Sequence, residues 1–116
     1  MTRDIQVYID DILDSIAKIE RYIKSIDEQN FLSDTQVQDA VLRRLEIMGE
    51  AVKNIPHNLR NKYPLIPWRT VAGLRDVLIH EYFGVNMRRV WKVAKHDINK
   101  LRQKILQVQK DLNSAD

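Results

Sequence analysis

Isoleucines recur along the first part of the chain at alternating spacings of four and three residues, from Ile5 to Ile26. This spacing is typical of a helix that packs along a narrow seam against a neighbouring helix. The stretch DEQNFLSD at 27–34 interrupts the pattern, and a second apolar series follows at the same spacing. Ser33, with Gln36 three residues later, resembles a capping box. We therefore predict one helix up to about Ile26 and a second that begins after Ser33.

All three prolines fall within residues 56–67, which marks an irregular connection, and a short helical turn is expected inside it at 57–63. A third helix is predicted over about 67–83, since proline is favoured in a first turn. Asn86 is expected to cap a last helix whose apolar positions again follow the three-four spacing. The pattern predicts an all-α fold, an antiparallel four-helix bundle-like domain over residues 1–116 with frayed last residues.

Composition narrows the classes of function. The chain has 116 residues, short for more than one domain, and no cysteine, which excludes disulfides and thiolate zinc sites. Its 19 basic and 16 acidic residues give a net charge of +3, too weak to establish nucleic-acid binding by itself. No signal-like or membrane-spanning apolar stretch is present, so we expect a cytoplasmic protein without membrane contact. His57 and His96 lack ligand spacing, so no metal and no cofactor are expected.

Arg75 interrupts the apolar side of the third predicted helix. Burying a lone guanidinium is costly, so Arg75 needs a carboxylate partner or faces a groove or an interface. At about 100° per residue, His80 lies about 140° around the helix from Arg75, while Tyr82 is two turns further on the same face. Two interpretations stay open: a buried structural ion pair, or a functional site completed by helix distortion or by a second copy of the chain.

The stretch RDVLIHEY, residues 75–82, matches the pattern R-x4-H-x-Y. Its surroundings are LRRLEIMGEAVKNIP at 42–56 and YPLIPWRTVAGLRDVLIHEYFGV at 63–85. Together they resemble the HEPN superfamily, and within it the HepT-like ribonuclease toxins, over most of the chain. The resemblance implies a homodimeric, metal-independent endoribonuclease of a type VII toxin–antitoxin system. Its implied partner is MntA, a minimal nucleotidyltransferase antitoxin.

By position, the resemblance implies that Arg75 and His80 form the catalytic pair and that Asp76 helps to orient them. Tyr82 is implied as the tyrosine that the antitoxin AMPylates to silence the toxin, although a tyrosine at a helix end is also ordinary packing. The chemistry is consistent with RNA cleavage, of tRNA or mRNA. Histidine transfers protons near working pH, and the arginine fork matches phosphate oxygens. Since one motif supplies one histidine, we expect a composite cleft in a two-fold dimer.

The last predicted helix is rich in basic residues, for which a solvated face is the simplest interpretation: Arg88, Arg89, Lys92, Lys95, Lys100, Arg102 and Lys104. The first three follow the motif closely and are candidates for binding RNA phosphates. Two alternatives to the toxin stay open. One is a non-catalytic HEPN module that binds nucleotide or a partner protein through Arg75 and His80. The other is a plain helical adaptor in which Arg75 pairs with a carboxylate.

Overall fold

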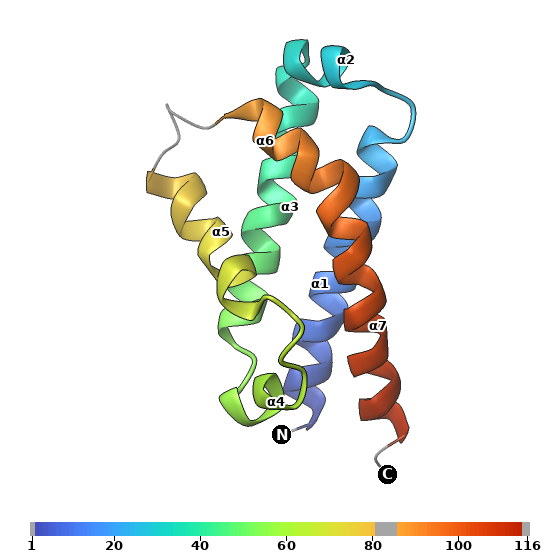
Figure 1. The fold of residues 1–116 in the computed structure, drawn as a ribbon, viewed down its shortest axis with the longest axis vertical. Coiled ribbons are helices and arrows are strands. Elements are labelled where there is room, and N and C mark those ends of the chain that lie inside the picture. Colours follow the sequence, from blue (N-terminus) through green and yellow to red (C-terminus); the bar gives the residue numbers. More distant parts are fainter. Residues whose placement is uncertain (1, 81–85, 115–116) are drawn as a thin grey trace.

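The computed structural model describes the backbone of residues 2–80 and 86–114 and the side chains of residues 5–74 and 86–114. The long helical segments run alternately up and down (Figure 1): α1 (Thr2–Ile23), α3 (Thr35–Lys53), α5 (Trp68–His80), and a last segment made of α6 (Met87–Lys92), the π-helical turn η2 (Val93–Asp97) and α7 (Ile98–Ser114). The short helices α2 (Glu28–Ser33) and α4 (His57–Lys62) lie in the connections at opposite ends. These ranges contain no strand. The predicted antiparallel four-helix arrangement is confirmed, as is the extra turn in the proline-containing connection.

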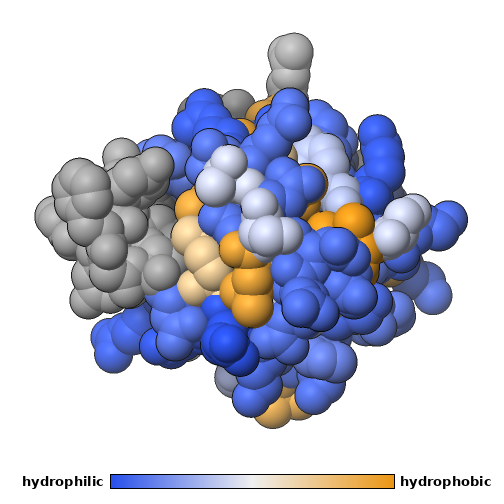
Figure 2. All heavy atoms as spheres, turned by 90° about the horizontal axis from the view of Figure 1, so that it is seen from above, coloured by the Kyte–Doolittle hydropathy of each residue, from blue (hydrophilic) through white to orange (hydrophobic). Residues whose placement is uncertain are grey.

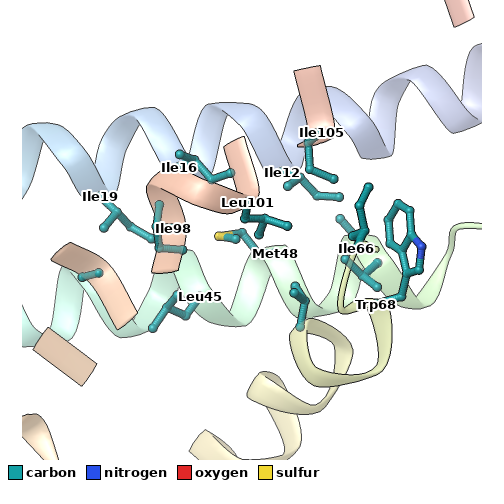
Figure 3. Close-up of a cluster of buried hydrophobic side chains, with 14 of the residues drawn as sticks. Ile12, Ile16, Ile19, Leu45, Met48, Ile66, Trp68, Ile98, Leu101 and Ile105 are labelled. Atoms are coloured by element: carbon teal, nitrogen blue, oxygen red, sulfur yellow. The ribbon is translucent and has the colours of Figure 1, made fainter. Parts of the chain in front are cut away.

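The core lies along the isoleucine seam of α1. Its members between Ile9 and Ile19 are wholly buried, because every third or fourth residue of a helix returns to the same face. Figure 3 shows Ile12 and Ile16 of α1 close to Met48 of α3 and Leu101 of α7. Helix α1 packs mainly on α3 and α7, and α5 packs mainly on α3. The periodicity of the sequence therefore predicts which faces meet in the core.

Helix α3 begins after Asp34 and not after Ser33. The Asp34 carboxylate accepts a hydrogen bond from the backbone N–H of Val37 at 3.1 Å, as an N-cap residue does. Ser33 instead ends α2, where its hydroxyl donates to the carbonyl oxygens of Gln29 and Asn30. The predicted capping box is wrong by one residue, because the short helix α2 was not expected.

Hydrogen bonds in the proline-containing connection orient the start of α5. The Arg60 guanidinium donates to the carbonyl oxygens of Val52 at 2.6 Å and Ile55 at 3.0 Å. The indole N–H of the buried Trp68 donates to the carbonyl oxygens of Arg60 and Tyr63. Three of these carbonyl oxygens, those of Val52, Arg60 and Tyr63, also accept a backbone N–H, so the side chains add a second bond to each. They hold the first turn of α5 against the end of α3, and so set the direction of the helix that carries Arg75 and His80.

Candidate active site

The expected catalytic residues lie near the end of α5, which stays α-helical through His80. Up to that residue the described backbone shows no distortion of the helix. Positions 75 and 80 therefore differ by about 140° around the axis, whereas positions 76 and 80 differ by about 40°. The structure thus brings Asp76 and His80 to one face of α5 and places Arg75 on another.

The positions of Arg75, Asp76 and His80 are defined by the backbone, since the described side chains are those of residues 5–74 and 86–114. Tyr82, the expected site of AMPylation, lies outside the described residues. Gly73 shares the face of Asp76 and His80, which follow it by three and seven residues. A β-carbon added at Gly73 meets no heavy atom within 4 Å in the described chain. This face of α5 is therefore open beside the candidate catalytic positions.

The candidate phosphate-binding residues lie at the same end of the bundle as His80. Arg88, Arg89 and Lys92 are exposed on α6, and the end of α5 and α6 share the upper end in Figure 1. The Asn86 side chain caps α6 by accepting from the backbone N–H groups of Arg88 at 3.0 Å and Arg89 at 3.3 Å, as predicted. Six residue steps separate His80 from Asn86, which limits their Cα atoms to about 22 Å apart.

Hydrophilic residues cover most of this end of the molecule, which Figure 2 views from above. Hydrophobic residues show only in limited areas between them. The surface around α6 is therefore hydrophilic, and the exposed Arg88, Arg89 and Lys92 give α6 the basic character that binding of RNA phosphates requires.

A groove of about 260 Å³ lies between α5 and the η2–α7 segment, with Met48 of α3 at its base. The two walls carry residues at the same three-four spacing, because each is one face of a helix. From the α5 side come Pro67, Thr70, Val71 and Leu74, and from the other side come Val93, Asp97, Ile98, Lys100, Leu101 and Lys104. The groove exists because α5 packs chiefly on α3 while α7 packs chiefly on α1.

The groove was not anticipated from the sequence, which predicted only a solvated face for Lys100 and Lys104. A usable signal was present in the spacing of the last helix. Asp97, Lys100 and Lys104 are separated by three and four residues, and the apolar Leu101 lies among them. Charged residues along one edge of an apolar stripe mark the border between a buried and an exposed surface.

A hydrogen-bonded pair joins the connection before α5 to α7. The Tyr63 hydroxyl donates to Oδ2 of Asp111 at 2.5 Å, and the Gln107 amide donates to Oδ1 at 2.8 Å. Burial and the bond to Asp111 raise the pKa of Tyr63 to about 12. The hydrogen bonds from Tyr63 and Gln107 hold the pKa of the Asp111 carboxyl below its ordinary value. The contact between Tyr63 and Asp111 stabilises the fold, and neither residue belongs to the R-x4-H-x-Y motif.

Among the described residues, no three histidine, aspartate or glutamate side chains are grouped as a metal site requires. None of the described helices has the length and apolar character needed to cross a membrane.

Comparison with known proteins identifies the family. The family model described as "Ribonuclease HepT-like" matches residues 12–108. A Thermococcus cleftensis protein named "Probable ribonuclease HepT" is 46% identical over 110 residues, which are 95% of this chain and 100% of that protein. A "Putative RNase" of Methanocaldococcus jannaschii is 40% identical over 114 residues, 98% of this chain and 94% of the relative.

A longer protein of Methanocaldococcus jannaschii, named "Gamma-glutamylcyclotransferase and putative RNase", is 46% identical over 113 residues. The match covers 97% of this chain but only 51% of that relative, so the chain spans about half of its length. No solved structure matches the chain. From the family model over most of its length and from these relatives, the chain belongs to the HepT-like family of ribonucleases.

Proposed function

We propose that this chain is a metal-independent endoribonuclease toxin of a type VII HEPN/MNT system. It cleaves tRNA or mRNA at a cleft between two copies of the chain. The observation that carries the proposal is an intact R-x4-H-x-Y sequence within a HepT-like match over residues 12–108. The helical register of α5 supports the two-copy cleft, since Arg75 and His80 occupy different faces of one helix.

The proposed reaction uses the RNA itself as the nucleophile. The 2′-oxygen attacks the adjacent phosphorus, the bond from phosphorus to the 5′-oxygen breaks, and a 2′,3′-cyclic phosphate forms. His80 of one copy accepts the proton of the 2′-hydroxyl, and His80 of the other copy gives a proton to the leaving 5′-oxygen. Arg75 stabilises the charge on the phosphorane oxygens. Asp76, four residues before His80 on the same face, holds the imidazole in orientation.

A homodimer meets the geometric requirement of this reaction. A two-fold axis beside α5 places two arginines and two histidines at one cleft. The open surface at Gly73, on the face of Asp76 and His80, leaves room for RNA or for the second copy. Arg88, Arg89 and Lys92, exposed at the same end, hold the flanking phosphates.

Regulation is proposed at Tyr82, two residues after His80 in the motif. An MntA-like nucleotidyltransferase transfers AMP from ATP to the tyrosine oxygen, with release of pyrophosphate and of the hydroxyl proton. The added group brings bulk and negative charge to the edge of the cleft. RNA phosphates are then excluded by blockage and by like-charge repulsion.

The test compares wild type with His80→Ala and with His96→Ala, an exposed histidine of η2 that serves as the matched control. Each protein is incubated with total cellular RNA in the presence of EDTA, and the ends of the products are identified. We expect cleavage by wild type and His96→Ala that leaves 2′,3′-cyclic phosphate or its hydrolysis product, and a loss of at least about a hundredfold in His80→Ala. The assay is repeated after incubation with the partner nucleotidyltransferase and ATP, which should silence wild type but not Tyr82→Phe.

Two outcomes contradict the proposal. Cleavage that persists in His80→Ala removes the catalytic role of that histidine. No cleavage by wild type, with intact mass excluding an AMP group, favours the alternative of a non-catalytic HEPN module that binds nucleotide or a partner.

A further inference from the structure

We propose that the groove between α5 and η2–α7 binds one unpaired base of single-stranded RNA, with the neighbouring phosphates held by Lys100 and Lys104. This substrate-binding site is separate from the cleft of Arg75 and His80. The inference rests on the proposed function, because it concerns how the same substrate is held.

The floor of the groove matches the flat apolar faces of a base. Val71 and Leu101 are only 5% and 7% exposed, and Met48 is wholly buried beneath them. Leu74 and Val93 are half-buried on the two walls. An unstacked base loses its contacts with neighbouring bases and can be held between apolar side chains instead. The volume of about 260 Å³ lies below the range of roughly 300–1,000 Å³ for drug-sized ligands, which suits one base.

The rim of the groove carries the charges that a nucleotide requires. Lys100 and Lys104 are exposed and follow one another by one helical turn on the α7 side. The Lys104 ammonium also donates to the carbonyl oxygen of Leu65 at 3.1 Å, which holds this side chain along the rim. Two cations one turn apart are suited to successive phosphates of a strand.

Asp97 distinguishes a nucleotide site from a simple phosphate site. Its carboxylate is exposed at the edge of the groove and has no hydrogen-bond or ion-pair partner among the described side chains. A carboxylate repels phosphate but accepts hydrogen bonds from an exocyclic amino group, as on cytosine. Uracil has the same size and lacks that amino group. The groove should therefore prefer cytosine to uracil.

The charge of a second hollow argues against RNA binding there. A hollow of about 280 Å³ lies between α1 and α3, where Arg43 is the basic residue of the lining. Its acidic residues are Asp11, Glu46 and Glu50. Their net negative charge repels phosphate, whereas the α5–α7 groove has two lysines against one aspartate.

The position of the groove links it to the proposed reaction. Leu74, at one end of the lining, immediately precedes Arg75. Thr70 and Arg75 are separated by about 7.5 Å along the axis of α5. A strand with one base in the groove is thereby led along α5 toward the proposed catalytic positions.

The binding test uses proteins that also carry His80→Ala, so that RNA is not consumed. Fluorescence anisotropy measures the Kd for labelled oligocytidine and oligouridine. Thr70→Trp fills the groove from an exposed position of its wall, and Lys100→Ala with Lys104→Ala removes the rim charges. The matched control is Lys24→Ala with Lys110→Ala, two exposed lysines outside the groove.

We expect each groove variant to raise the Kd about tenfold, which corresponds to about 1.4 kcal/mol of binding free energy. The double lysine variant should also flatten the dependence of log Kd on log salt by about 1.4, because about 0.7 is lost per single-strand phosphate contact. Asp97→Ala should remove the preference for oligocytidine. The control pair should retain the wild-type Kd.

An unchanged Kd in both groove variants overturns the inference, as does the absence of binding to either oligonucleotide. If Thr70→Trp changes the oligomeric state in light scattering and leaves RNA affinity intact, the groove holds a second copy of the chain and the inference is wrong. If Thr70→Trp does not fold, the Kd of the variant with Lys100→Ala and Lys104→Ala decides the question, because both lysines are exposed. Cleavage that survives His80→Ala contradicts the proposed function instead, and the Kd values are then compared on 2′-O-methyl oligonucleotides, which lack the attacking hydroxyl.

Discussion

Gly73 lies in the middle of α5, two residues before Arg75, although glycine disfavours the helical conformation. Glycine costs about 1 kcal/mol relative to alanine at such a position. Packing within the described chain does not require it, since an added β-carbon meets nothing within 4 Å. The cost is therefore better explained by something that approaches α5 from outside, which agrees with a cleft on this face.

Gly73→Ala tests this explanation. We expect the free energy of unfolding to rise by about 1 kcal/mol, because alanine favours the helix. RNA cleavage should fall by about tenfold or more, because the methyl group displaces RNA or the second copy by roughly 1 Å. Thermal unfolding and the cleavage assay measure the two effects. Ala17→Gly, on the exposed face of α1, is the control: it should lose stability and keep its activity. A fully active Gly73→Ala protein would show that this face does not line the cleft.

At the scale of elements, hydrogen bonds tie the proline-containing connection to α3, α5 and α7. Arg60 ties it to the end of α3 and Trp68 ties it to the start of α5, while Tyr63 and Lys104 tie it to α7. Both of the last two bonds join residues that come shortly before α5 to α7, and Lys104 also lines the groove. They therefore set the separation between α5 and α7.

Tyr63→Phe should lower the Tm by a few degrees near neutral pH, because it removes the bond to Asp111. The pKa of Asp111 is lowered in the folded chain, so its contribution is complete above the ordinary value of 3.8 and is lost as the pH falls through the folded pKa. The pKa of Tyr63 is raised from 10.0 to about 12, so its contribution is complete below pH 10.0 and is lost as the pH rises through about 12.

The difference in Tm between wild type and Tyr63→Phe should therefore be constant in the middle range and should shrink at both extremes. Thermal melts across the pH range measure it. Tyr22→Phe, on the half-buried face of α1, is the control without this bond to Asp111. A difference that stays the same in acid would show that the Tyr63 hydroxyl stabilises the fold without the charge of the Asp111 carboxylate.

At the scale of the whole molecule, the chain is an elongated bundle of 47 × 29 × 22 Å. Helix α5 is held mainly on one side, by α3. The helix that carries the motif therefore has surface free for other partners. Under the proposed function, this surface is where a second copy of the chain would complete the cleft, because Arg75 and His80 lie on different faces of α5.

A mixed dimer tests the composite cleft. Wild type and His80→Ala are co-expressed with different tags, and the dimer that holds one copy of each is isolated. It should be nearly as inactive as His80→Ala alone, because the single cleft needs a histidine from each copy. A mixed dimer that keeps about half of the wild-type activity would place each site within a single chain.

Much of this architecture was predictable from local pattern. The three-four spacing of Val41, Leu45 and Met48 predicts the buried face of α3, and Asn86 predicts the start of α6. The short helix α2 was missed because it offers a single buried residue, Phe31, and so no periodicity. The π-helical turn at Val93–Asp97 was missed because the apolar spacing continues across it without a break.

The sequence by itself determined the helices, the core faces and the family, because all three depend on residues that lie close together along the chain. The angle between Arg75 and His80 around α5 likewise follows from their spacing along the chain. Only the tertiary structure decided that α5 leans on α3 and leaves a groove beside α7. That groove joins Thr70 to Lys100 and Lys104, which lie thirty or more residues further on. Contacts between distant segments depend on how whole helices pack, and no local spacing of residues specifies that packing.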